Sequence, residues 1–368
     1  MVTRAILLMF SLFTGAHALG QSISQTPKHY DGQSFDLQAH RGGLGLVTES
    51  SLQAFANAMR LGVTTLELDI QISEDRVAIV THDRQVAAEK CRDTAPLHAA
   101  DTEFPYVGKF IKDLSLAQIQ TLDCGSLVLD DFPQQRLVPG VTMPTLLEVL
   151  HLVKLYSADE LILNIETKVE AGAPHETAPR EQFVSLVLHD IDIAAMRDQV
   201  TIQSFDWAAL MLMRERAGKI PIIALLGQSF LRCGESGSSP WTGGIDADDY
   251  QCNPIAIAHS FGASAISPVH GDPQDGSIGQ TGYVPFVTEK FVRDAHDIGM
   301  KVIPWTVDDP ATATHLVKLG VDGIITNYPD RLRDVMAEFN IPLPKAYFPP
   351  ENCETKLTPE MNPILCDL

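Results

Sequence analysis

Two histidines lie where short apolar segments of this chain end. His40 and Arg41 follow the segment 35–39 and precede two glycines, while His82 closes the segment 77–82. Two imidazoles with pKa values near neutrality can share acid–base chemistry, one accepting a proton while the other donates one. A lone His-Arg pair more often belongs to an ordinary turn. A catalytic interpretation therefore requires other functional residues that could lie near His40 and Arg41 in the fold.

Glu67 and Asp69 lie two positions apart in the apolar segment 64–70. In a β-strand such residues point to the same side, and two adjacent carboxylates repel each other unless a cation lies between them. Their oxygens suit Mg²⁺ or Ca²⁺, and Ca²⁺ is favoured in an exported protein. The alternative is an edge strand on which Glu67 or Asp69 faces solvent.

The segment 161–166 repeats this spacing. Asn164, Glu166 and Lys168 share one side of the predicted strand, which adds a third carboxylate and a cation. Gln203 and the aromatic Trp305 belong to two later apolar segments. If all these segments end at one face of a common sheet, their polar side chains must converge there.

The elements that would bring them together alternate along the chain. Apolar, strand-like segments cover 35–40, 64–70, 77–82, 161–166, 200–205, 221–227, 263–268, 301–307 and 323–327. Helical patterns cover 50–61, 145–156, 180–195, 207–217, 288–298 and 311–319. This alternation predicts an α/β fold with a parallel sheet, and the strand count favours closure into a (β/α)₈ TIM barrel.

One strand is in excess, because the stretch 71–76 is too short for a helical crossover between parallel strands. We therefore expect a distorted barrel with a tight turn around Glu74 and Asp75. The barrel domain is predicted to cover 35–340, with insertions after barrel strands at about 84–140 and 227–252. Such insertions commonly line pockets. The Pro-rich segment 341–368 is predicted to be a surface strap.

The first residues have the pattern of a signal peptide over 1–18. Arg4 precedes the apolar run 5–13, and Ala16-His17-Ala18 follows as a small-x-small cleavage site. We expect an exported protein, periplasmic or secreted. The run is too short to span a bilayer, and no other run reaches eighteen apolar residues.

Six cysteines without C-x-x-C spacing favour disulfides over a metal or redox site in an exported chain. We prefer pairs of sequence neighbours, which are Cys91–Cys124, Cys233–Cys252 and Cys353–Cys366. The net charge of −20 argues against a nucleic-acid partner, which needs a basic face, but not against a small anionic substrate near a metal ion. The oligomeric state is left open.

Several motifs occur in one order along the chain. They are HRGG at 40, ELDIQISEDRVAIVTHD at 67–83, NIETK at 164, QSF at 203, PWTVDD at 304 and GVDGIITNYPD at 320–330. With them the chain resembles the glycerophosphodiester phosphodiesterase family, one of the phospholipase-C-like TIM-barrel phosphodiesterases, over most of 37–335.

The resemblance implies hydrolysis of glycerophosphodiesters to glycerol 3-phosphate and an alcohol. It implies His40 and His82 as general acid and base, in either order, and a divalent metal held by the carboxylates Glu67, Asp69 and Glu166. It also implies phosphate contacts from Arg41 and Lys168. Gln203 and Trp305 join these two as candidates for substrate binding.

Two positions depart from the family pattern. Thr48-Glu49-Ser50-Ser51 stands where Pro-Glu-Asn-Thr is usual, with Ser50 as a candidate helix cap, and Asp308 stands where Asn is common. Two alternatives stay open beside the leading hypothesis. One is lysophospholipase D-like activity, and the other is a non-catalytic binding protein on the same barrel, which would have no need of the two histidines.

Overall fold

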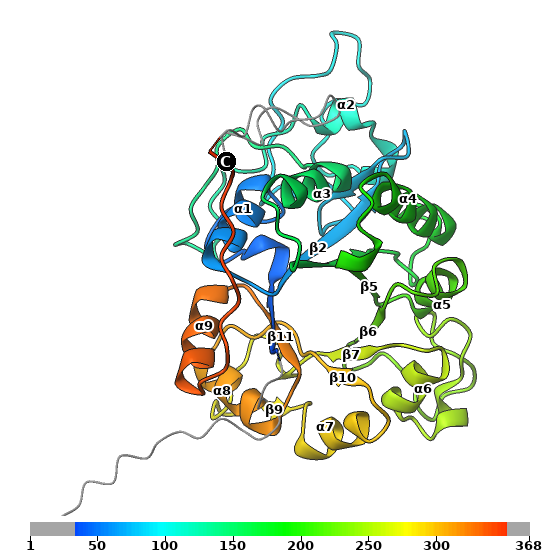
Figure 1. Ribbon diagram of the computed structural model, residues 1–368. Coiled ribbons are helices and arrows are strands. Elements are labelled where there is room, and N and C mark those ends of the chain that lie inside the picture. Colours follow the sequence, from blue (N-terminus) through cyan, green and yellow to red (C-terminus); the bar gives the residue numbers. More distant parts are fainter. Residues whose placement is uncertain (1–33, 352–368) are drawn as a thin grey trace, which may run out of the picture.

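The computed structural model describes residues 34–351 and has a parallel sheet at its centre. Eight strands lie in the order β10-β7-β6-β5-β4-β2-β1-β11, each parallel to its neighbours (Figure 1). Their bounds are β1 Asp36–Ala39, β2 Thr65–Ile72, β4 Ile162–Thr167, β5 Val200–Ser204, β6 Ile222–Leu226, β7 Ala265–Pro268, β10 Lys301–Val302 and β11 Gly323–Thr326.

Backbone hydrogen bonds close this sheet between its two ends. The amide of Asp322 donates to the Val302 carbonyl at 2.9 Å, and the amide of Ile325 donates to the Pro304 carbonyl at 3.0 Å. β10 is shorter than the expected strand 301–307 because Pro304 has no N–H to donate to a neighbour. The predicted TIM-barrel fold is confirmed.

Helices surround the barrel, as Figure 1 shows. They are α1 Leu52–Leu61, α3 Leu146–Leu155, α4 Arg180–Ile193, α5 Trp207–Arg216, α6 Pro254–Ser260, α7 Glu289–His296, α8 Pro310–Leu319 and α9 Pro329–Glu338. The sequence patterns missed α6 and α9. Both have proline in the first turn, and α6 is capped by Asn253, whose side chain accepts from the amides of Ile255 and Ala256. The cap of α1 is Ser51 and not Ser50, since Ser51 accepts from the Ala54 amide at 3.1 Å.

The excess strand is a hairpin partner of β2. β3 Ala78–Val80 pairs antiparallel with β2, with Ile70 opposite Val80 and Ile72 opposite Ala78. The turn closes where the Ser73 amide donates to the Val77 carbonyl at 3.0 Å. The distortion expected around Glu74 and Asp75 is therefore the turn of a hairpin, which β2 and β3 form at the edge of the barrel.

The insertion after β3 forms a small core of its own. Val86, Tyr106, Ile111 and Ile119 are buried together against Ile79 of β3. Its short helix α2 Leu116–Ile119 begins with a capping box between Ser115 and Gln118. This segment lies above the barrel in the view of Figure 1.

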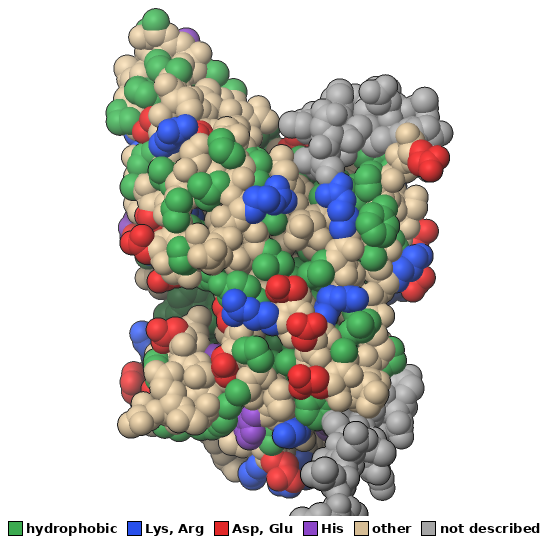
Figure 2. Space-filling model, turned by 90° about the vertical axis from the view of Figure 1, so that its left-hand side faces the viewer, with side chains coloured by type: hydrophobic (Ala, Val, Ile, Leu, Met, Phe, Trp, Pro, Cys, Tyr) green, Lys and Arg blue, Asp and Glu red, His purple; other side chains and the backbone are tan. Residues whose placement is uncertain are grey.

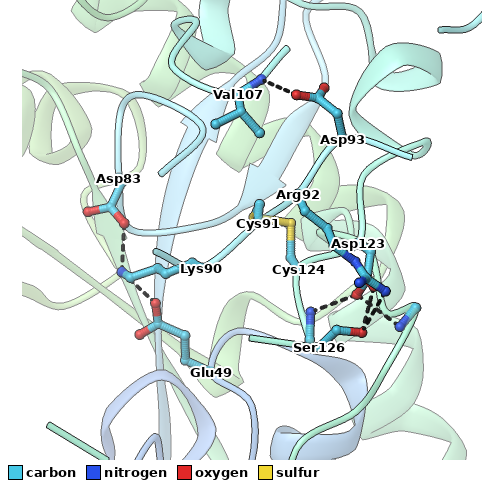
Figure 3. Close-up of a disulfide and its surroundings, with 12 residues drawn as sticks. Glu49, Asp83, Lys90, Cys91, Arg92, Asp93, Val107, Asp123, Cys124 and Ser126 are labelled. Atoms are coloured by element: carbon cyan, nitrogen blue, oxygen red, sulfur yellow. Dashed lines mark hydrogen bonds and ion pairs between the residues drawn. A yellow bond between two sulfur atoms is a disulfide. The ribbon is translucent and has the colours of Figure 1, made fainter. Parts of the chain in front are cut away.

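Two of the three preferred disulfides are present. Cys91 is bonded to Cys124 (Figure 3), and Cys233 is bonded to Cys252. The pair Cys353–Cys366 and the signal peptide at 1–18 lie outside the described residues.

Residues 341–351 run along α9 and α1 on the surface (Figure 1). The Tyr347 amide donates to the Met59 carbonyl at 2.9 Å, and Arg333 Nη1 donates to the carbonyls of Gly62 and Pro344. On the face shown in Figure 2, Lys and Arg side chains are interspersed with Asp and Glu. Within residues 34–351, no helix has the length and apolar character needed to cross a membrane.

Asp123 links several parts of the first insertion (Figure 3). Its side chain accepts from the amides of Gly125 at 3.1 Å and Gly140 at 2.9 Å, from Ser126 Oγ at 2.6 Å and from Arg92 Nε at 2.8 Å. Burial alone would raise the Asp123 pKa, but these donors lower it to about 2.

We predict that Asp123→Asn lowers the free energy of unfolding at pH 7 by about 1–3 kcal/mol, because charge-assisted hydrogen bonds are lost. A depressed carboxyl pKa stabilises the fold above the unfolded pKa of 3.8 and loses that effect as pH falls toward 2. The difference between variant and wild type should therefore shrink from about pH 4 downward. Urea unfolding at several pH values measures it, with Asp113→Asn, an exposed carboxylate in the same insertion, as the control. Equal stability of the Asp123→Asn variant and wild type at pH 7 would contradict the prediction.

Candidate active site

The HRGG segment forms a tight turn at the end of β1. Arg41, Gly42 and Gly43 have φ values of 51°, 83° and 91°, all in the left-handed region. Glycine enters this region without strain, whereas arginine does so at a cost. A Cβ on Gly42 would also lie 2.8 Å from Ala54 Cβ. The turn directs the Arg41 amide to Glu67 Oε2 at 2.9 Å.

Strand register places the three carboxylates together. Asp69 of β2 lies opposite Glu166 of β4, and Glu67 lies two residues before Asp69 on the same face. Oxygens of Glu67, Asp69 and Glu166 all lie within 4.8 Å of one another, and all three residues are buried. The edge-strand alternative, in which Glu67 or Asp69 faces solvent, is therefore wrong.

A chain of amides supports Glu67 from inside the barrel. Gln203 Nε2 donates to Glu67 Oε1 at 2.8 Å, and Asn164 Nδ2 donates to Gln203 Oε1 at 2.8 Å and to Gln38 Oε1 at 2.9 Å. Gln203 lines the pocket, as expected of a substrate contact, but its amide nitrogen also orients a predicted metal ligand.

Burial and the charges of neighbouring side chains shift the pKa values of the cluster. Burial and the neighbouring Asp69 and Glu166 raise the pKa of Glu67 well above its usual value. Burial and Asp69 raise the pKa of Glu166 to about 7, although Lys168 opposes this. Burial would also raise the pKa of Asp69, but Lys168, His82 and Arg41 lower it below its usual value.

Arg41 and Lys168 partly offset this negative charge. Lys168 Nζ lies 3.0 Å from Glu166 Oε1 and 3.7 Å from Asp69 Oδ1, and Arg41 Nη1 donates to Glu49 Oε2 at 2.8 Å. Arg41 Nε lies 3.1 Å from Asp69 Oδ2, yet among residues 34–351 no donor makes a hydrogen bond with that buried oxygen. Both cations therefore lie beside the carboxylate cluster, and Arg41 is shared between this cluster and Glu49.

His40 is held by Asn327, the residue after β11, and Asn327 is held in turn by Asp308, which precedes α8. Its Nδ1 lies 2.6 Å from Asn327 Oδ1, while Asn327 Nδ2 donates to Asp308 Oδ2 at 2.7 Å. Burial and the Arg41 charge lower the pKa of His40 to about 3, so the ring is neutral at pH 7.

His82 reaches the same rim through the β2–β3 hairpin. The Thr81 amide donates to the Asp69 carbonyl at 3.0 Å, which sets the following residue beside the carboxylates. His82 Nδ1 lies 2.8 Å from Asp83 Oδ1. Burial and the Lys168 and Arg41 charges lower the pKa of His82 to about 4, so this ring is also neutral.

A pocket of 350 Å³ contains all nine predicted site residues. They are His40, Arg41, Glu67, Asp69, His82, Glu166, Lys168, Gln203 and Trp305. Phe205 forms part of its wall, with its ring edge-to-face with Trp305 at 5.5 Å between centroids. A second cavity of 470 Å³ shares His82, Lys168 and Phe205 with this pocket and extends to Trp241.

Sequence reasoning missed several residues of this site. Asn327 is the residue after β11, so the rule that strand ends meet at one rim could have selected it. Asp83 could have been found because it directly follows His82, which the sequence had already indicated. Asp308 was noticed only as a departure from a family pattern, and its contact with Asn327 accounts for its place.

The geometry defines a class of protein: a TIM barrel whose C-terminal rim carries three carboxylates, two cations and two neutral imidazoles in one pocket. The model of the glycerophosphoryl diester phosphodiesterase family matches residues 40–331. The chain belongs to this family.

The sequences of several relatives align with this chain over most of their length. A glycerophosphodiester phosphodiesterase of Caldanaerobacter subterraneus is 28% identical over 80% of this chain and 94% of that protein. A human lysophospholipase D is 22% identical over 81% of this chain and 83% of that protein. The crystal structure of a Silicibacter pomeroyi protein that bears the same family name superposes with a TM-score of 0.68 at 27% identity, over 84% of this chain and 95% of that one.

The acidic cluster fits a divalent cation. Its oxygens are close together, Asp69 Oδ2 is buried without a hydrogen bond from the described residues, and the raised pKa values of Glu67 and Glu166 reflect charge that a cation would offset. Carboxylate oxygens suit Ca²⁺ and Mg²⁺, and the geometry does not select between them.

We predict that Ca²⁺ or Mg²⁺ raises the melting temperature of chelator-treated protein, because a ligand that binds only the folded state stabilises it. Differential scanning fluorimetry measures the shift, which should be lost in Glu67→Gln and in Glu166→Gln. Glu103→Gln, which removes an exposed carboxylate paired with Lys109, should keep it. A shift that persists in Glu67→Gln and Glu166→Gln would place the cation elsewhere.

Proposed function

We propose that this chain hydrolyses glycerophosphodiesters to glycerol 3-phosphate and an alcohol. The observation that carries the proposal is one pocket lined by three clustered carboxylates and two histidines, in a chain of the glycerophosphoryl diester phosphodiesterase family. The similarity to the Caldanaerobacter enzyme over 94% of its length supports the same activity.

In the proposed reaction, Glu67, Asp69 and Glu166 would hold a divalent metal, which would supply Lewis-acid polarisation of the phosphoryl oxygens. Arg41 and Lys168 supply positive charge beside it for the phosphate. One of His40 and His82 takes the proton from the attacking hydroxyl or water. The other donates a proton to the departing alkoxide, so that the P–O bond breaks as a new one forms.

The overall reaction consumes one water molecule. Over a full cycle each histidine returns to the protonation state in which it began. Burial lowers the pKa of both imidazoles in the free protein, and the negative charge of a bound phosphate would raise the pKa of the imidazole that donates the proton. Asn327 and Asp83 orient the two rings through their Nδ1 atoms.

Export is part of the same proposal. Its support is the signal-peptide pattern at 1–18 together with the cysteine pairs Cys91–Cys124 and Cys233–Cys252, because disulfides persist in oxidising compartments.

We predict that His40→Ala and His82→Ala each lower kcat for glycerophosphocholine by about 10²–10⁴-fold, because each removes a proton-transfer group. A coupled assay of glycerol 3-phosphate release, run with and without a chelator, measures the loss. His98→Ala replaces an exposed histidine of the first insertion and should match the wild type. Full activity in the His40→Ala/His82→Ala double variant would remove the mechanism.

A second candidate substrate class is the lysophospholipids. A cavity of 660 Å³ is lined by Arg41, Glu49 and other charged residues, and also by apolar side chains of the first insertion. These side chains are Leu127, Val128, Leu129 and Phe132. An acyl chain buried there would gain about 0.8 kcal/mol for each CH₂ removed from water. The similarity to a human lysophospholipase D supports testing it.

If this cavity takes an acyl chain, Val128→Asp should lower kcat/KM for lysophosphatidylcholine by about 10-fold and leave glycerophosphocholine unaffected. Choline release measures both substrates. Leu97→Asp is the matched control, since Leu97 is another exposed apolar residue of the same insertion and does not line the cavity. An equal effect of Val128→Asp on the two substrates would exclude this cavity as the acyl site.

A further inference from the structure

Lys90 lies between Glu49 and Asp83, beside the candidate active site (Figure 3). Its Nζ is 2.6 Å from Glu49 Oε1 and 2.6 Å from Asp83 Oδ2. The second oxygen of Glu49 accepts from Arg41 Nη1 at 2.8 Å, and the second oxygen of Asp83 lies 2.8 Å from His82 Nδ1. One ammonium group thus links a proposed phosphate contact to a proposed catalytic histidine, through one carboxylate on each side.

The first insertion fixes where Lys90 stands. Cys91, the next residue, is bonded to Cys124 (Figure 3), and Arg92 and Asp123 exchange backbone hydrogen bonds at 2.9 and 3.1 Å. On the other side, the Lys90 amide donates to the Ala87 carbonyl at 3.1 Å. The backbone of Lys90 is therefore anchored at both ends, which reduces the entropy lost when its long side chain is held between two carboxylates.

Lys90 has an orienting effect besides its contribution to stability. Its side chain is 21% exposed, so solvent screens its two ion pairs only in part. The orienting effect arises because Asp83 touches both Lys90 and the ring of His82. A carboxylate on Nδ1 selects the tautomer and the orientation of an imidazole, and small losses of orientation are costly for proton transfer.

We propose that Lys90 is a positioning residue for the hydrolysis described above, and that it fixes the placement of His82 relative to Arg41 by bridging Asp83 and Glu49. This inference rests on the proposed function. Arg41 and His82 line the pocket of 350 Å³, but Lys90 does not. Loss of Lys90 should therefore lower turnover more than it weakens substrate binding.

The test compares steady-state kinetics on glycerophosphocholine. We expect Lys90→Met to lower kcat by about 10–100-fold, as removal of an orienting partner commonly does, with KM changed by less than about 3-fold. Lys90→Arg should recover most of the lost kcat, since a guanidinium can bridge two carboxylates. Lys112→Met is the matched control, because Lys112 forms its ion pair with Asp113, an exposed aspartate of the same insertion, and does not line the pocket.

A second pair of variants tests the anchor without touching the charges. Cys91→Ser/Cys124→Ser should lower kcat in the same direction as Lys90→Met, while Cys233→Ser/Cys252→Ser, which removes the other described disulfide, should not. Thermal unfolding of each variant establishes that it is folded under the assay conditions.

Two results would overturn the inference. One is a Lys90→Met variant with the wild-type kcat, and the other is a Lys90→Arg variant no more active than Lys90→Met. Both leave the proposed function intact if the wild type releases glycerol 3-phosphate. A wild-type chain that is inactive on every glycerophosphodiester, with metal supplied, would instead remove the proposed function and this inference with it.

Discussion

Repulsion among three buried carboxylates is the constraint around which the rim of this barrel is organised. Glu67, Asp69 and Glu166 lie within a few ångströms of one another and away from water, a situation that costs free energy unless positive charge is supplied. Arg41 and Lys168 supply part of this positive charge. A divalent cation would supply more, and together these charges would make the site suitable for an anionic substrate.

Most of this site could be predicted because strand geometry is regular. The period-two spacing of Glu67 and Asp69, and of Asn164, Glu166 and Lys168, sets which side chains share a face whatever the details of the fold. The alternation of strands and helices then sets the barrel and the rim at which the strands end. These inferences needed only local patterns.

What the sequence did not reveal depends on contacts between distant segments. His82 was expected at the end of a barrel strand, yet β3 is antiparallel, and the histidine reaches the rim because a hairpin returns to it. The contacts of Asn327 with His40 and of Asp308 with Asn327 join residues from opposite ends of the chain or from different loops. Lys90 lies in an irregular insertion, where no periodicity indicates the direction of a side chain.

The turn that follows β1 limits how this chain can diverge. Gly42 has a positive φ, and any side chain there would collide with Ala54 of α1, so substitution would displace Arg41 and the amide that serves Glu67. The carboxylates themselves lie on rigid strands and would survive such a change. A side chain at position 42 would therefore disturb hydrolysis through the turn alone, in a barrel whose acidic strands were still intact.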